Sequence, residues 1–133
     1  MVERWSALDI LVNNAAKLTP SCAVAAIDPA DWQRPLAVNL TGAWLMARWS
    51  IPHMLAAGRG VVLNMASPLG HVDLPAKAAH CTSKAALIAP TRSIAVDYGA
   101  NGIRAVSLPP SRLAAASYLH RVVIPTSALS RSE

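Results

Sequence analysis

Short apolar runs alternate with longer stretches of helical periodicity along this chain. Three runs have the branched aliphatic content and length of strands buried on both faces: Leu8–Val12, Val61–Leu63 and Ile103–Leu108. Between them, over residues 28–57 and 76–98, apolar residues recur every three or four positions, which predicts two helices. This alternation predicts an α/β fold: part of a doubly wound parallel sheet, with about three core strands and flanking helices.

Local signals mark the ends of the two predicted helices. Asp28-Pro29 supplies an N-cap and a first-turn proline for the first helix, and Gly58 ends it. The Asn101-Gly102 turn closes the second. Pro35 and Pro90 fall inside the helices, where each removes a backbone hydrogen bond at a cost of about 3 kcal/mol or more. For Pro35 a helpful and a harmful bend both stay open, whereas Pro90, as a second interior proline, counts against a well-packed native protein.

Length and composition fit one such domain. The 133 residues are 53% hydrophobic and only 14% charged, as expected when the strands are buried on both faces of the sheet. No run approaches the roughly 18 apolar residues of a membrane span, and the first residues lack the apolar core of a secretory signal. Cys22 and Cys81 have neither metal-ligand nor disulfide spacing. We expect reduced thiols, a cytoplasmic location and no metal site.

The net charge of +5 comes from basic residues scattered singly along the chain. Clusters of Lys and Arg interleaved with aromatics are absent from the sequence, as are nucleic-acid motifs, so we expect no nucleic-acid partner. A basic surface remains compatible with a phosphate-bearing cofactor.

Polar side chains follow two of the predicted strands. Asn13 comes directly after the first, and Ser67 follows the second after a short apolar stretch. The helix over 76–98 then carries His80 and Lys84 one turn apart on one face. Because ligands of open α/β sheets bind at the carboxyl ends of the strands, we expect the Ser67 hydroxyl and the Lys84 ammonium to face one crevice.

These motifs resemble the short-chain dehydrogenase/reductase family over roughly residues 8–110, a family with a Rossmann-like sheet. Asn13-Asn14-Ala15-Ala16 is similar to the family's Asn-Asn-Ala-Gly signature, with alanine in place of the glycine. Asn39, Ser67 and Lys84 match the spacing of the family's Asn, Ser and Tyr-x-x-x-Lys. The tyrosine position is occupied by His80.

The resemblance implies NAD- or NADP-dependent hydride transfer between a small-molecule alcohol and a ketone or other carbonyl compound. By analogy, Ser67 orients the substrate oxygen and Asn39 anchors a proton-relay water. Lys84 lowers the pKa of the acid/base group and holds the nicotinamide ribose, and His80 stands where that acid/base acts. The residues that correspond to the cofactor-binding set are Asn13, Ala15, Lys84 and Pro109.

Two departures from the family pattern predict impaired activity. Imidazole is a common acid/base, but the ring of His80 reaches less far than a phenol, its cation is repelled by Lys84, and we expect no orienting partner for it. None of the six glycines forms the family's Thr-Gly-x-x-x-Gly-x-Gly phosphate turn. Residues 1–110 are therefore expected to be the C-terminal part of such a domain, without about three strands. Residues 111–133 stay unassigned.

Two functions from different classes remain open. The first is an oxidoreductase of the short-chain type; the second is a non-catalytic remnant or pseudoenzyme that acts only as an oligomerising scaffold. In either case the family resemblance implies a homo-oligomer formed through the helices over 28–57 and 76–98. A serine hydrolase is not favoured, because the sequence has no Gly-x-Ser-x-Gly elbow.

Overall fold

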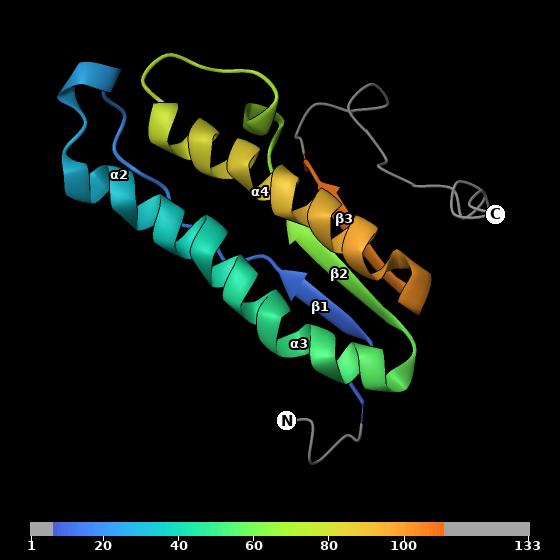
Figure 1. The fold of residues 1–133 in the computed structure, drawn as a ribbon. Helices are drawn as coiled ribbons and strands as arrows, with labels where there is room; N and C mark the ends of the chain where they lie inside the picture. Colours follow the sequence, from blue (N-terminus) through green and yellow to red (C-terminus); the bar gives the residue numbers. More distant parts are fainter. Residues whose placement is uncertain (1–6, 111–133) are drawn as a thin grey trace.

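The three predicted strands form one parallel sheet (Figure 1). The computed structural model describes residues 7–110, so the unassigned tail over 111–133 lies outside the described residues. The strands run in chain order across the sheet: β1 (Ile10–Asn13), β2 (Gly60–Met65) and β3 (Ile103–Leu108). Asn13 pairs with Asn64, and Asn64 pairs with Ser107, so the carboxyl ends of all three strands meet at one edge. The predicted fold class is confirmed.

Helices connect the strands, as parallel pairing requires. The main helices are α2 (Pro29–Pro35), α3 (Ala43–Ala57) and α4 (Ala78–Tyr98). Shorter helical segments link them: η1 (Val24–Ala26), the π-helical η2 (Leu36–Gly42), η3 (Pro68–Gly70) and η4 (Gly99–Asn101).

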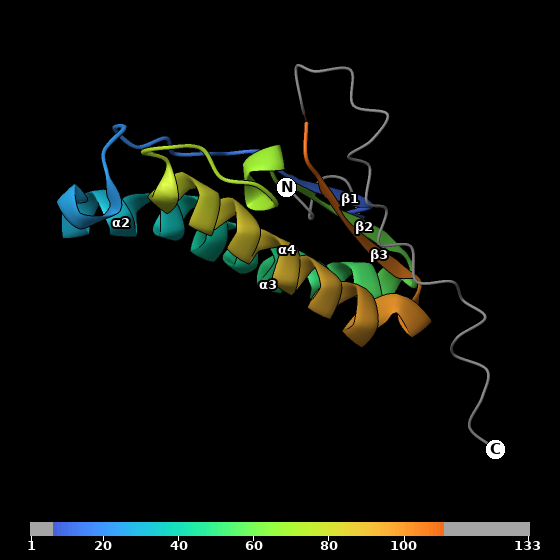
Figure 2. The same ribbon diagram turned by 90° about the horizontal axis from the view of Figure 1, so that it is seen from above.

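Both long helices, α3 and α4, cover the same face of the sheet (Figure 2). The core lies between them and that face, and it consists of Leu11, Ala47, Ile51, Met54, Val62, Ile94, Ile103 and Ala105. On β1, Ile10 and Val12 point to the opposite face and are 60% and 51% exposed. Within residues 7–110, the sheet is therefore covered on one face only.

The helical stretch over 28–57 begins as predicted but is not one regular helix. Asp28 caps α2, since its Oδ1 accepts the Ala30 N–H at 2.8 Å. Pro35 ends α2, and the chain continues through the wider π-helical turn of η2 before α3 begins. A proline cannot donate to the carbonyl four residues back, so a change of helical winding beside Pro35 has a clear physical reason.

The helix predicted over 76–98 begins two residues later, at Ala78. Ala76 has φ +61°, a left-handed conformation that cannot belong to an α-helix. As predicted, Pro90 lies inside this helix, and α4 runs unbroken through it to Tyr98. Its buried stripe, which includes Leu87, Thr91 and Ile94, packs onto the sheet despite the proline.

Candidate active site

Lys84 brings a buried ammonium to the carboxyl edge of the sheet. The residue is only 5% exposed, and its Nζ donates to the carbonyl oxygen of Met65 at 2.5 Å. Met65 is the last residue of β2, two positions before Ser67. Burial lowers the pKa of the Lys84 ammonium, because removing a cation from water disfavours the charged form.

Ser67 lies at the turn that leaves β2. It caps η3, and its Oγ accepts the backbone N–H of Leu69 at 3.2 Å. The residue is half-buried, and its hydroxyl hydrogen has no acceptor within residues 7–110. In the described part of the chain no hydrogen bond joins Ser67, His80 and Lys84 to one another.

Asn39 lies in the π-helical turn η2 and is almost completely buried, at 1% exposed. Its Oδ1 accepts the Lys17 N–H at 2.7 Å, and its Nδ2 donates to the Lys17 carbonyl at 3.2 Å. Nδ2 also donates to the Ser83 hydroxyl at 2.9 Å, and that hydroxyl donates to the carbonyl of His80 at 2.8 Å. The Asn39 side chain is therefore fully engaged in joining η2, the loop at Lys17 and α4.

Sequence reasoning missed Ser83, which is completely buried. The available signal was its position, three residues after His80 and directly before Lys84, which puts it on the inner face of α4.

His80 occupies the first turn of α4 and is 9% exposed. Its Nδ1 is buried and has no hydrogen-bond partner among the residues that the structure describes. Burial, and then the positive charges of Lys84 and Lys77, lower the pKa of the His80 imidazole. Both features bear on the expected weakness of this ring as an acid/base, which stays a prediction.

Asn13, the last residue of β1, uses its side-chain amide to hold the sheet together. Nδ2 donates to Asn64 Oδ1 at 2.8 Å and to the Ala43 carbonyl at 3.2 Å. Asn64 Nδ2 in turn donates to Thr91 Oγ1 at 2.8 Å, and the Thr91 hydroxyl donates to the Leu87 carbonyl. Only Oδ1 of Asn13 is left for a ligand. Sequence reasoning missed Asn64, although a polar residue within an apolar strand was the visible signal.

The remaining predicted cofactor residues also follow strands. Ala15 lies exposed just after β1, and Pro109 lies half-buried just after β3. Both are therefore at the same edge of the sheet as Ser67, although no direct contact joins them to it.

A hollow of about 180 Å³ lies beside this edge, between η3 with the loop after it and α4. Its lining includes His71, Asp73 and Cys81. Burial and the neighbouring Asp73 raise the pKa of the Cys81 thiol, which favours its protonated form. Across residues 7–110, no group of three or more His, Cys, Asp or Glu side chains could hold a metal ion. None of the helices in that range is long and apolar enough to cross a membrane.

Similarity to known proteins agrees with this arrangement. The family model for short chain dehydrogenases matches residues 1–118. A 2-(R)-hydroxypropyl-CoM dehydrogenase of Xanthobacter autotrophicus is 40% identical over 84% of this chain and 46% of its own length. A second protein of that organism, named as an inactive 2-(S)-hydroxypropyl-CoM dehydrogenase, is 36% identical over 78% of this chain and 45% of its own length.

A solved structure extends the similarity to the fold. The gluconate 5-dehydrogenase of Burkholderia cenocepacia, in complex with NADP and tartrate, has a TM-score of 0.78 and 33% identity, covering 82% of this chain and 42% of that one. The chain spans about half the length of the curated relatives it matches. With its three-stranded parallel sheet, its lysine at the carboxyl edge and these matches, the chain belongs to the short-chain dehydrogenase/reductase family.

Proposed function

We propose that this chain carries the substrate side of an NAD(P)-dependent oxidoreductase site that transfers hydride between a small alcohol and a ketone or other carbonyl compound. The observation that carries the proposal is the buried ammonium of Lys84, held by the Met65 carbonyl two residues from Ser67. A buried lysine without an ion pair costs free energy, so its retention at the carboxyl edge of a parallel sheet favours a role in binding or catalysis.

The side chains support distinct roles. Ser67 has a hydroxyl hydrogen free to donate, which suits a substrate oxygen. Lys84 has one of its three hydrogens on Met65, so two remain for a ribose hydroxyl or a neighbouring acid/base group. The Asn39 side chain is fixed by three hydrogen bonds, which favours its backbone rather than its amide as the anchor of a relay water.

The residues at this edge fit the cofactor, with Asn13 on the adenosine side and Pro109 beside the nicotinamide. NAD or NADP, when bound, would supply or accept the hydride. Asn13 offers its free Oδ1, Ala15 offers exposed backbone, and Pro109 offers an apolar contact after β3. The related gluconate 5-dehydrogenase, solved with NADP and tartrate, supports a nucleotide cofactor for the family.

His80 supports only weak turnover at the acid/base position. With the Nδ1 buried and unpartnered, a protonated ring would bury an unsatisfied N–H beside two lysines. A neutral ring that resists protonation is a poor proton donor to a developing alkoxide.

Cofactor titration followed by a turnover assay tests the proposal. We expect NADH or NADPH to quench the emission of Trp32, Trp44 or Trp49 saturably, while NAD(P)-linked oxidation of alcohols stays near background. Robust turnover by the purified 133-residue chain would contradict the impairment. No binding up to millimolar cofactor would reject the oxidoreductase proposal.

The second candidate is a non-catalytic scaffold that assembles through its helices. The unpartnered Nδ1 of His80 favours it, as does the similarity to a relative that is named inactive. Trp44 and Trp49 on α3 supply exposed apolar surface for a homo-oligomer. The cytoplasmic location stays a prediction.

A further inference from the structure

We infer that the hollow between η3 and α4 binds the ammonium group of an amino alcohol, with the Asp73 carboxylate as its anion. The inference rests on the proposed function, because the hollow would hold the far end of an alcohol whose oxygen lies at Ser67. It names the class of substrate for that site and a residue that selects it.

The hollow adjoins the proposed site on both of its walls. Leu69 lines the η3 wall, and the Leu69 N–H donates to Ser67 Oγ at 3.2 Å. Cys81 lines the α4 wall and directly follows His80 in the chain. The two walls meet at Gly70, where a Cβ would come within 3.0 Å of the backbone of α4. An alcohol that is held by its oxygen at Ser67 would therefore lie beside this hollow.

The polar groups of the hollow suit a cation. Its lining carries the Asp73 carboxylate and the Thr82 hydroxyl, together with His71, and contains no lysine or arginine of the described residues. Within residues 7–110, Asp73 forms no ion pair with a lysine or an arginine. Its carboxylate accepts a hydrogen bond from the Cys81 thiol, which leaves further lone pairs for a ligand.

The two sides of the first turn of α4 differ in electrostatic potential. Consecutive residues of a helix point about 100° apart, so Cys81 and His80 face different sides. Burial raises the pKa of the Cys81 thiol, and the Asp73 carboxylate raises it further. Burial lowers the pKa of the His80 imidazole, and Lys84 and Lys77 lower it further. An ammonium group is therefore favoured on the side of the hollow and repelled on the side of the imidazole.

The size of the hollow limits the ligand to a short chain. Its volume is about 180 Å³. Because a water molecule takes about 30 Å³ in the liquid, this space suits a group of about six heavy atoms. Pockets that enclose a whole drug-sized ligand are larger, about 300–1,000 Å³. The hollow would therefore hold one end of the substrate, and a short aminoalkyl chain fits it.

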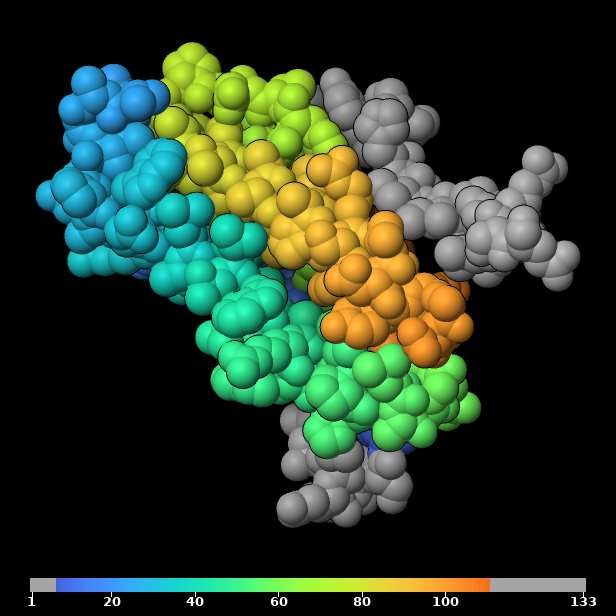
Figure 3. Space-filling model, in the orientation of Figure 1, coloured from blue at the N-terminus to red at the C-terminus, as the bar shows by residue number. Residues whose placement is uncertain are grey.

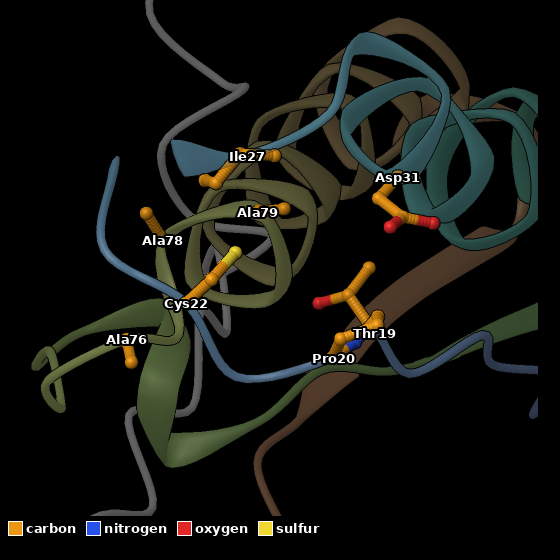
Figure 4. A pocket seen from close by; sticks show the side chains of 8 residues that line it. All are labelled: Thr19, Pro20, Cys22, Ile27, Asp31, Ala76, Ala78 and Ala79. Carbon is orange, nitrogen blue, oxygen red and sulfur yellow. The ribbon is translucent and has the colours of Figure 1, made fainter. Parts of the chain in front are cut away.

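A second hollow near the start of α4 is less suited to an ammonium group (Figure 4). Thr19, Asp31 and Ala79 are among the residues that line it. Its carboxylate, Asp31, already pairs with Arg34 at 3.2 Å, and its interior is too narrow for a water molecule. Of these two hollows, the one at Asp73 therefore has both the charge and the room.

Three alcohols that differ only in their last group test the inference: 4-aminobutan-2-ol, butane-1,3-diol and pentan-2-ol. They end in an ammonium, a hydroxyl and a methyl group at pH 7, since a primary amine has a pKa of about 10. The readout is the amide NMR signals of Thr82 and Ala85 in the full chain. We expect saturable shifts with the amine, at an affinity about threefold or more above that of the neutral alcohols, because solvent screens an exposed ion pair.

Matched variants separate charge from shape and from folding. Asp73→Asn keeps an acceptor for the Cys81 thiol and should reduce the affinity for the amine to that for the diol. Asp97→Asn removes a carboxylate from an exposed position near the other end of α4 and should leave the preference unchanged. Ala85→Leu fills the hollow from an exposed position and should weaken binding of the amine although Asp73 remains.

Three results would overturn the inference. One is equal affinity for the amine and the neutral alcohols, and another is an unchanged preference in Asp73→Asn. The third is unweakened binding in Ala85→Leu, since the amine would then pair with a carboxylate at the surface and not inside the hollow.

Cofactor titration of the same samples keeps the two claims apart. If NADH binds and the amine shows no preference, the amino-alcohol site is rejected while the oxidoreductase proposal survives. If the amine binds in the hollow through Asp73 and NADH does not bind, the ammonium site stands and the oxidoreductase proposal is rejected.

Discussion

His80 is the residue on which the proposed catalysis depends. The imidazole stands one turn from a lysine that is itself buried, and its Nδ1 has no acceptor among residues 7–110. The anionic form of a phenol at this position would be stabilised by the Lys84 ammonium. An imidazole instead becomes a cation when it is protonated, and Lys84 repels that cation. The same cationic surroundings that suit a tyrosine therefore lower the pKa of a histidine, in addition to the effect of burial.

We expect the protonation of His80 to make the fold less stable in mild acid. Its folded-state pKa lies below the ordinary value of 6.5 because of burial, Lys84 and Lys77. The unfolded chain then binds more protons as the pH falls below about 6.5, so the free energy of unfolding declines there and is highest above that pH. Urea unfolding at pH 8 and at pH 5.5 measures this decrease in the free energy of unfolding.

His80→Gln should reduce this loss, since glutamine does not titrate. His53→Gln, at an exposed position of α3, is the matched control and should leave the loss as in the parent chain. An equal acid sensitivity in the parent and in His80→Gln would show that other groups are responsible.

At the scale of elements, buried polar side chains hold β1, β2 and α4 in register. Asn13, Asn64 and Thr91 form a chain of hydrogen bonds that ends on the carbonyl of Leu87. Asn64 and Thr91 are both buried, so each bond replaces one that water would otherwise make. This network fixes the amide of Asn13 and leaves its Oδ1 at the carboxyl edge of the sheet.

Thr91→Val should lower the free energy of unfolding by about 1–3 kcal/mol. Valine keeps the shape of threonine but leaves the Nδ2 of Asn64 buried without an acceptor. Ser93→Ala removes a hydroxyl from an exposed position of α4 and should change the stability by less than about 0.5 kcal/mol. Chemical denaturation of both variants measures the free energy of unfolding. Similar decreases in the two variants would mean that the hydrogen-bond network contributes little to stability.

At the scale of the whole molecule, two apolar surfaces remain uncovered within residues 7–110. One is the open face of the sheet at Ile10 and Val12, and the other is the outer side of α3 at Trp44 and Trp49. The space-filling view looks onto the helical side of the molecule (Figure 3). Exposed apolar patches of this kind mark interaction sites, and the proposed homo-oligomer would use the helical one.

Trp49→Glu should therefore lower the particle mass, as measured by analytical ultracentrifugation, towards that of a monomer. Trp49 is 60% exposed, so the change places a charge in the proposed interface without disturbing the core. Val12→Glu is the matched control on the open sheet face and should leave the assembly intact. If Val12→Glu dissociates the assembly and Trp49→Glu does not, the sheet face is the interface instead.

The helices and strands show which structural features a local sequence pattern can predict. The cap at Asp28 and the strand over Ile103–Leu108 were predicted correctly, because capping and apolar runs depend on neighbours in the sequence. Pro90 was also placed correctly inside the second long helix, and α4 continues through it and packs on the sheet. The π-helical winding after Pro35 was not predicted at all.

The sequence by itself determined the order of strands and helices, the sheet edge where Ser67 and Lys84 would lie, and the replacement of tyrosine by His80. These depend on periodicity and spacing, which are local. Only the tertiary structure decided which polar groups are already engaged and which are free. Asn39 meets Lys17 and Ser83 across 22 and 44 positions, and Asn13 meets Asn64 across 51. Such partners come together only when the chain folds, so the lack of a partner for the Nδ1 of His80 among residues 7–110 could not be seen before it.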